Sequence, residues 1–191
     1  MNEVIGTITV LMTIFICGLY IRDTIKGKIK PHPFSWSIWF IITGTIFLAQ
    51  VSDSAGPGAW MNGVVTLINL LIAILALKNG FGLIKKLDVV VFIMAITAIA
   101  IWIVTSSPFY SVIILVIANT LGFIPTFRKS FYEPYSEPIY LYSVGFFRHG
   151  LSIIALSNYT LITALSSIML VIINLLVALF LIWRRYKVKR T

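Results

Sequence analysis

Seven long apolar runs, separated by short polar segments, constrain this chain more than any other feature. They cover residues 3–21, 34–51, 60–77, 88–104, 109–127, 138–156 and 161–183. A helix needs about 20 apolar residues to cross a bilayer, and each run is close to that length. Charged residues make up 11% of the chain, against about a quarter in soluble domains. The sequence therefore predicts an all-α membrane protein with seven transmembrane helices.

The basic residues indicate how these helices are oriented. Of the 15 Lys and Arg residues, all but Arg148 lie in alternate connections or in the C-terminal tail. Because cytoplasmic loops are enriched in Lys and Arg, we expect the N-terminus outside and the C-terminus in the cytoplasm. The same rule accounts for the net charge of +9, so we expect no nucleic-acid partner. The compact loops and the Ile- and Lys-rich composition favour a prokaryotic inner (plasma) membrane.

An internal repeat appears when the chain is shifted by 105 residues. The segment LINLLIAILAL (67–77) then aligns with IINLLVALFLI (172–182), which places Asn69 on Asn174, and Pro33 falls on Pro138. We therefore expect a 3+1+3 arrangement, with a three-helix repeat in 1–78, a linker helix region in 79–108 and a second repeat in 109–191. Two such repeats run parallel, and substrates of proteins built this way bind near the midplane between the repeats.

This arrangement, with its basic tail and the segment IPTFRKSFYEP (124–134), resembles the SWEET and PQ-loop transporter superfamily. Pro125-Thr126 stands where PQ-loop members have Pro-Gln. The resemblance implies gating roles for Pro33, Pro125 and Pro138, which are otherwise ordinary boundary residues of spans. It also implies solute contacts for Asn69 and Asn174, because an asparagine on the third helix of each repeat contacts the sugar in SWEET proteins. Arg148 and His149 lie outside that sugar pattern.

Strongly polar side chains near mid-depth are the candidate substrate-binding residues. Arg148 has no acidic residue at its depth, so its guanidinium either binds an anionic group or is satisfied by hydrogen bonds within the protein. Thr43 aligns with Arg148 in the repeat, and His149 is either a proton carrier or a neutral hydrogen-bonding group. Asparagines in a membrane also serve as contacts between helices. The full set is Thr43, Asn69, Asn119, Arg148, His149 and Asn174.

These features favour a transporter of a small polar solute, sugar-like or carboxylate-bearing, that works by alternating access. Two alternatives stay open: a ligand-binding receptor on the same scaffold, and a transporter for a nucleoside-like vitamin. Cys17 is the single cysteine, so no intrachain disulfide can form. We find no catalytic or metal-binding pattern, and expect no enzyme activity and no cofactor. We expect the lipid bilayer as a partner. Whether the protein forms a homo-oligomer is left open by the sequence.

Overall fold

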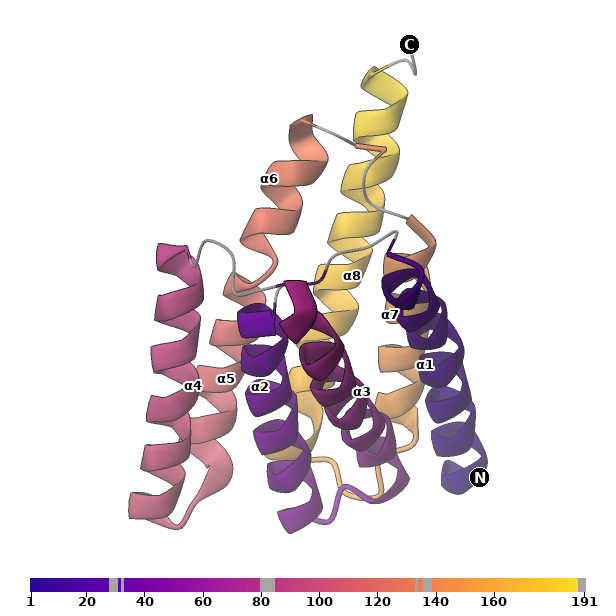
Figure 1. The fold of residues 1–191 in the computed structure, drawn as a ribbon. Helices are drawn as coiled ribbons and strands as arrows, with labels where there is room; N and C mark the ends of the chain where they lie inside the picture. Colours follow the sequence, from indigo (N-terminus) through magenta and orange to yellow (C-terminus); the bar gives the residue numbers. More distant parts are fainter. Residues whose placement is uncertain (28–30, 32, 80–84, 133, 136–138, 189–191) are drawn as a thin grey trace.

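The computed structural model describes residues 1–27, 31, 33–79, 85–132, 134–135 and 139–188. These residues form helices joined by short turns, and no β-strand occurs among them. Figure 1 shows the helices standing side by side, with the N-terminus at one end of the bundle and the C-terminus beyond the other. The elements are α1 (Asn2–Ile25), α2 (Pro33–Ser52), η1 (Gly56–Ala59), α3 (Trp60–Ala76), η2 (Leu77–Asn79), α4 (Lys86–Thr105), α5 (Pro108–Leu121), α6 (Ile124–Tyr132), α7 (Ile139–Ile154) and α8 (Leu161–Lys187).

Five segments of the described chain are long and apolar enough to cross a membrane. They are α1, α2, Gly56–Ala76 (η1 with α3), α4 and α8. Helix α5 is apolar but has 14 residues, and α7 has 16. The all-helical membrane fold expected from the sequence is confirmed at this level, while seven complete spans stay a prediction.

The surface of α1 shows why these helices suit lipid. Val4, Leu11 and Phe15 point outward, and Phe15 is 70% exposed, whereas Thr9 and Thr13 are completely buried. A helix of a water-soluble protein shows the opposite pattern, with polar residues outside. Each buried threonine donates its hydroxyl to a carbonyl of its own helix, at 2.7 and 2.8 Å. The apolar exterior therefore indicates a lipid environment, in which small and hydroxyl side chains mediate contacts between helices.

The packing of the helices has the same order in both halves of the chain. Helix α3 packs against α1 and α2, and α8 packs against α5 and α7. Between the halves, α1 contacts α7 and α2 contacts α5, while α4 packs on α5 and α2. The largest apolar core joins isoleucines of α2, among them Ile42 and Ile46, to small residues of α4 such as Ala95 and Ala98.

The fifth predicted span, 109–127, is wrong as one continuous helix. Helix α5 ends at Leu121, Gly122 and Phe123 form a turn, and α6 begins at Ile124. The N–H of Gly122 bonds to the carbonyls of Ala118 and Asn119, which closes the last turn of α5. Pro125 has no N–H, so it cannot continue the hydrogen-bond ladder of α5. The predicted span is therefore interrupted by a turn at Gly122 and Phe123.

Candidate functional site

The first half of the chain brings three polar side chains together between α2 and α3. Thr43 on α2 accepts hydrogen bonds from the hydroxyl of Thr66 and the amide of Asn69, both at 3.2 Å. Thr43 in turn donates to the carbonyl of Trp39 at 2.8 Å. We call Thr43, Thr66 and Asn69 the Thr43 cluster. Thr43 and Asn69 are thus neighbours in the structure, together with Thr66, which the sequence analysis did not nominate.

A second buried polar contact lies one to two turns closer to the N-terminus of α3. Gln50 is completely buried and donates to the carbonyl of Thr163 on α8 at 2.6 Å. Its own side-chain oxygen accepts from the amide of Asn62 at 2.8 Å. Gln50 therefore ties α2 to α8, across the two halves of the chain. Sequence reasoning missed Asn62, whose spacing with Thr66 and Asn69 places all three on one face of a helix.

In the second half, Asn174 on α8 packs directly against Gly145 on α7. A Cβ built on Gly145 would lie 2.7 Å from the side-chain carbon Cγ of Asn174. The amide of Asn174 donates to the carbonyl of Leu170, in its own helix, at 2.7 Å. Asn69 and Asn174, aligned in the sequence, are both buried on the third helix of their halves. However, Asn69 bonds across to α2, whereas Asn174 bonds within α8.

Arg148 points from α7 toward α1. One of its terminal nitrogens, Nη1, donates to the hydroxyl of Thr13 at 3.2 Å. The thiol of Cys17, one turn further along α1, also interacts with the guanidinium. The Nε atom of Arg148 is buried and has no hydrogen-bond partner among the described residues. The guanidinium therefore lies in a seam between the two halves, with part of its hydrogen-bonding capacity unused.

His149 lies on a different side of α7. It belongs to the buried face of α7 formed by Tyr142, Gly145, His149 and Ser152. Gly145 and Ser152 on this face contact Asn174 and Ser167 of α8. The ring nitrogen Nδ1 of His149 is buried without a partner in the described part of the chain. Consecutive helical residues project about 100° apart, so Arg148 and His149 point to different sides of α7.

The remaining candidates are more dispersed. Asn119 is half-buried on α5. Its backbone carbonyl accepts a hydrogen bond from the N–H of Gly122 at the end of that helix. Pro33 is the buried first residue of α2, and Pro125 is the second residue of α6. Pro138 lies outside the described residues. The structure thus assembles Thr43 with Asn69 and Asn174 with Gly145, and directs Arg148 to α1. No hydrogen bond among the described residues joins these groups to one another.

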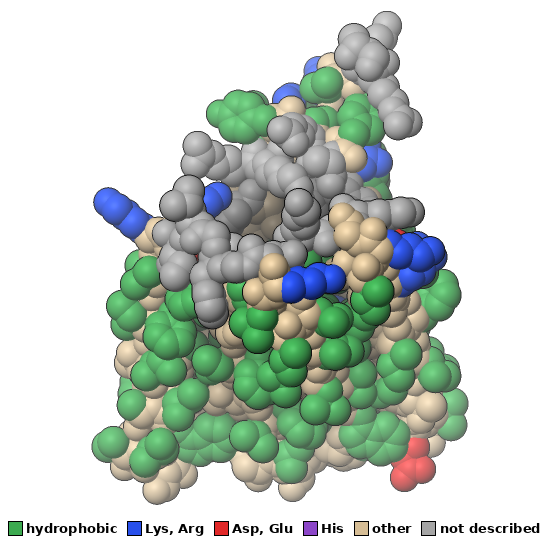
Figure 2. Space-filling model, viewed as in Figure 1, with side chains coloured by type: hydrophobic (Ala, Val, Ile, Leu, Met, Phe, Trp, Pro, Cys, Tyr) green, Lys and Arg blue, Asp and Glu red, His purple; other side chains and the backbone are tan. Residues whose placement is uncertain are grey.

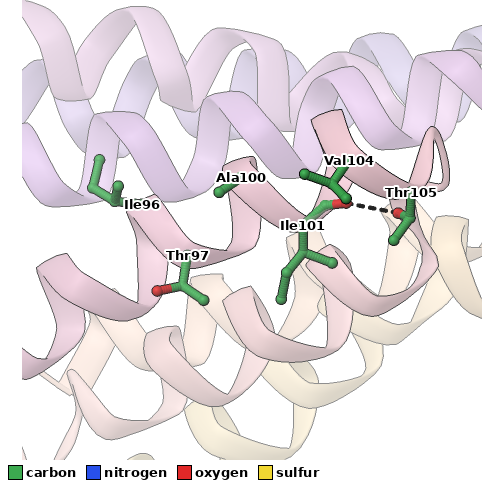
Figure 3. Close-up of a pocket in the computed structure, with 6 residues that line it drawn as sticks. All are labelled: Ile96, Thr97, Ala100, Ile101, Val104 and Thr105. Atoms are coloured by element: carbon green, nitrogen blue, oxygen red, sulfur yellow. Dashed lines mark hydrogen bonds between the residues drawn. The ribbon is translucent and has the colours of Figure 1, made fainter.

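A pocket on α4 does not involve any of these side chains. Figure 3 shows its lining residues, Ile96, Thr97, Ala100, Ile101, Val104 and Thr105, all on one helix. The hydroxyl of Thr105 donates to the carbonyl of Ile101. Ile96 and Val104 belong to the exposed hydrophobic surface of the bundle. The pocket is therefore a depression in the apolar surface of α4, remote from the polar residues described above.

The described residues contain no group of three or more His, Cys, Asp or Glu side chains that could hold a metal ion. Comparison of the chain with protein-family models, with curated proteins and with solved structures finds no match.

Proposed function

We propose that this protein carries a small polar solute across the membrane by alternating access between two three-helix units. The units are residues 1–78 and 109–191, joined by the α4 region, residues 79–108. The observation that carries the proposal is the shared packing order: the third helix of each unit lies against the first and the second. The two contacts between the units, α1 with α7 and α5 with α2, match as well. Each joins the first helix of one unit to the second helix of the other. Such an arrangement is that of parallel repeats.

The distribution of charge supports a cytoplasmic C-terminus. Figure 2 shows Lys and Arg side chains gathered near the end of the molecule at which the C-terminus lies, above a broad hydrophobic belt. This face carries an acidic side chain at the opposite end of the molecule. The positive-inside rule then puts the loops between α2 and α3 and between α7 and α8 outside. A plasma membrane of a prokaryote fits this reading.

The outer ends of the two units are joined by a hydrogen bond between backbone groups and by hydrogen bonds from polar side chains to backbone carbonyls. The N–H of Ser157 donates to the carbonyl of Ala55, and the amide of Asn158 donates to the carbonyl of Asp53, both at 2.9 Å. The hydroxyl of Ser152 donates to the carbonyl of Gly58 at 2.8 Å. We call these contacts the outer clasp. In an alternating-access cycle, the clasp closes the outer side and must break before a solute enters from outside.

The midplane residues supply the solute contacts in this proposal. Asn69 and Asn174 orient the solute, in keeping with the resemblance to SWEET transporters, and Arg148 offers charge. The side chains of the Thr43 cluster are hydrogen-bonded to one another. A polar solute that binds there would replace these hydrogen bonds with its own. Transport runs down a gradient or is coupled to an ion, because the sequence has no ATP-binding motif. Asn119 is a further contact from α5.

Uptake by proteoliposomes tests this proposal. The purified protein is reconstituted and offered radiolabelled sugars, monocarboxylates, phosphorylated metabolites and nucleosides, beside empty liposomes. We expect saturable uptake of at least one class and its loss in Asn69→Ala and Asn174→Ala at equal reconstitution. Binding of a ligand without any uptake would instead identify a receptor. Unchanged uptake in both variants would remove these asparagines from the site.

A further inference from the structure

We propose that the seam between α1 and α7 is a binding site for a singly charged carboxylate, held by the guanidinium of Arg148. This inference deepens the proposed function, on which it rests for its biological meaning, by naming the chemical class of the solute. The guanidinium of Arg148 lies between α1 and α7 and has no counter-ion among the described residues.

The described acidic residues are too far from Arg148 to neutralise it. Its contact residue Thr13 lies ten residues from both Glu3 and Asp23 on α1, which is about 15 Å along the helix. Asp23 already pairs with Arg22 at 3.0 Å, the one ion pair in the described part of the chain. Asp53 and Asp88 follow α2 and open α4, two helices that face other neighbours. An ionised guanidinium without a partner is costly in a membrane interior.

The hydrogen bonds around Arg148 leave one edge of its guanidinium without a partner among the described residues. Thr13 is a neutral partner for Nη1 alone, and its hydroxyl hydrogen is already given to the carbonyl of Thr9 at 2.8 Å. Nε is buried and unpartnered. A guanidinium presents Nε–H and an Nη–H as a parallel pair that matches the two oxygens of a carboxylate. The unused edge of Arg148 is therefore the edge suited to bidentate binding.

The charge of the site favours a carboxylate over a phosphate. Arg148 supplies one positive charge, and Thr13 and Cys17 supply none. His149 lies on the buried face of α7 that also carries Gly145 and Ser152. A carboxylate balances this charge, whereas a phosphate monoester, which carries between −1.5 and −2 at neutral pH, would leave negative charge in an apolar place. The seam also joins the two proposed units, so a bound anion would contact both.

Protection of Cys17 measures occupancy of this site without any mutation. Cys17 is the single thiol of the chain and lies beside the guanidinium. We expect sodium acetate, lactate or benzoate to slow the reaction of Cys17 with N-ethylmaleimide. At ten times the Kd the rate should fall about tenfold, since about a tenth of the protein stays free. Sodium chloride at equal ionic strength, glucose and inorganic phosphate should give less than a twofold change.

Three variants assign the effect to Arg148. Arg148→Gln should lose the protection, Arg148→Lys should keep part of it, and Thr13→Val, which removes only the neutral partner, should keep all of it. The proposal is overturned if chloride or phosphate protects as well as the carboxylates, or if Arg148→Gln is protected like the wild type. A Cys17 that no carboxylate protects would also overturn it.

Solute uptake by proteoliposomes, measured beside the protection of Cys17, distinguishes a failure of the anion site from a failure of the proposed transport function. If carboxylates protect Cys17 but proteoliposomes take up no solute, the anion site stands and transport fails. If a neutral solute is taken up equally by the wild type and Arg148→Gln, and no carboxylate protects Cys17, transport stands and the anion site fails. Because the wild-type measurement needs no variant, a failure of Arg148→Gln to fold leaves the question decidable.

Discussion

Small and hydroxyl-bearing residues, rather than large apolar ones, make the closest contacts between helices in this protein. Gly145 lets the amide of Asn174 approach the backbone of α7, and Ser111 donates to the carbonyl of Ala98 at 2.6 Å. Lipid tails are as apolar as leucine, so burying leucine against a neighbour gains little in a bilayer. Close packing and hydrogen bonds therefore determine which helix faces pack together. Substitutions that add or remove a single atom at these contacts should change stability by a measurable amount.

Replacing Gly145 by alanine tests the closest of these contacts. The added Cβ would lie 2.7 Å from Cγ of Asn174, so the amide must move and its bond to Leu170 must weaken. We expect a loss of about 1–3 kcal/mol in stability, as for other overpacked sites. Gly150→Ala on the same helix is the control, because nothing lies within 4 Å of its Cβ. Thermal unfolding in detergent measures both, and equal stabilities would contradict the contact.

The Thr43 cluster can be tested with a substitution that keeps its shape. Thr43→Val removes the oxygen that accepts from Thr66 and Asn69, and should lower stability by about 0.6–1.7 kcal/mol. Thr43→Ser retains the hydroxyl and should restore most of that loss. Reversible unfolding in mixed micelles distinguishes the two variants. A serine variant as unstable as the valine variant would mean that the methyl group, not the hydrogen bonds, matters here.

At the scale of elements, the ends of the helices are set by local residues and the outer loops by contacts between distant segments. Helix α8 begins at a capping box, in which Thr160 accepts from the N–H of Thr163 and Thr163 accepts from the N–H of Thr160. The hydroxyl of Thr160 also bonds to the carboxylate of Asp53, in the loop after α2. One residue thus both starts a helix and joins the outer ends of the two proposed units.

The substitution Gly56→Ala tests how tightly the loop after α2 packs against the segment at Ser157. Its φ of +62° lies in the left-handed region, and a Cβ there would lie 2.8 Å from Cβ of Ser157. Gly27 also has a positive φ, of +71°, but nothing lies within 4 Å of its Cβ. Gly27→Ala should therefore cost about 1–2 kcal/mol for the backbone alone. Gly56→Ala should cost about 1–3 kcal/mol more, and equal losses in thermal unfolding would argue against the outer clasp.

At the scale of the whole molecule, α8 is the longest helix among the described residues. Its 27 residues span about 40 Å, which exceeds the hydrocarbon thickness of about 30 Å. Its last turns extend beyond the other helices (Figure 1). There Arg184 donates two hydrogen bonds to the carbonyl of Phe131, at 3.0 and 2.6 Å, and lies over its ring. Helix α6 is thereby attached to the end of α8 that we place in the cytoplasm.

Labelling of single cysteines tests this orientation. In a Cys17→Ser background, Tyr159→Cys and Lys187→Cys place one thiol near each end of α8, at residues exposed in the structure. A membrane-impermeant maleimide added to intact cells should label residue 159 at once and residue 187 only after permeabilisation. The opposite result would reverse the topology, and labelling of both residues in intact cells would show that α8 does not span the membrane. The Cys17→Ser protein without added cysteine is the control.

Most of the helical architecture could be predicted from the sequence, because the hydrophobic period and length of a span are local properties. Six of the seven predicted runs correspond to a single helix within a few residues, whereas the direction of the helices across the membrane stays a prediction from the alternate basic loops. The exception, 109–127, contained its own signal in Gly122 and Pro125. Asn69 and Asn174, which the repeat aligns, are both buried on the third helix of their halves, and their contact with a solute stays a prediction.

What the sequence by itself determined about this protein is the set of apolar helices and the polar residues that lie within them. The tertiary structure alone decided where those polar groups point. Arg148 could have faced any neighbour of α7, and the packing of α1 against that helix gave it Thr13 and Cys17, 135 residues away along the chain in the case of Thr13. His149, one residue further, lies on the face of α7 whose Gly145 and Ser152 contact α8. The physical reason is that hydropathy depends on each segment alone, whereas the partner of a buried polar group depends on which helices touch.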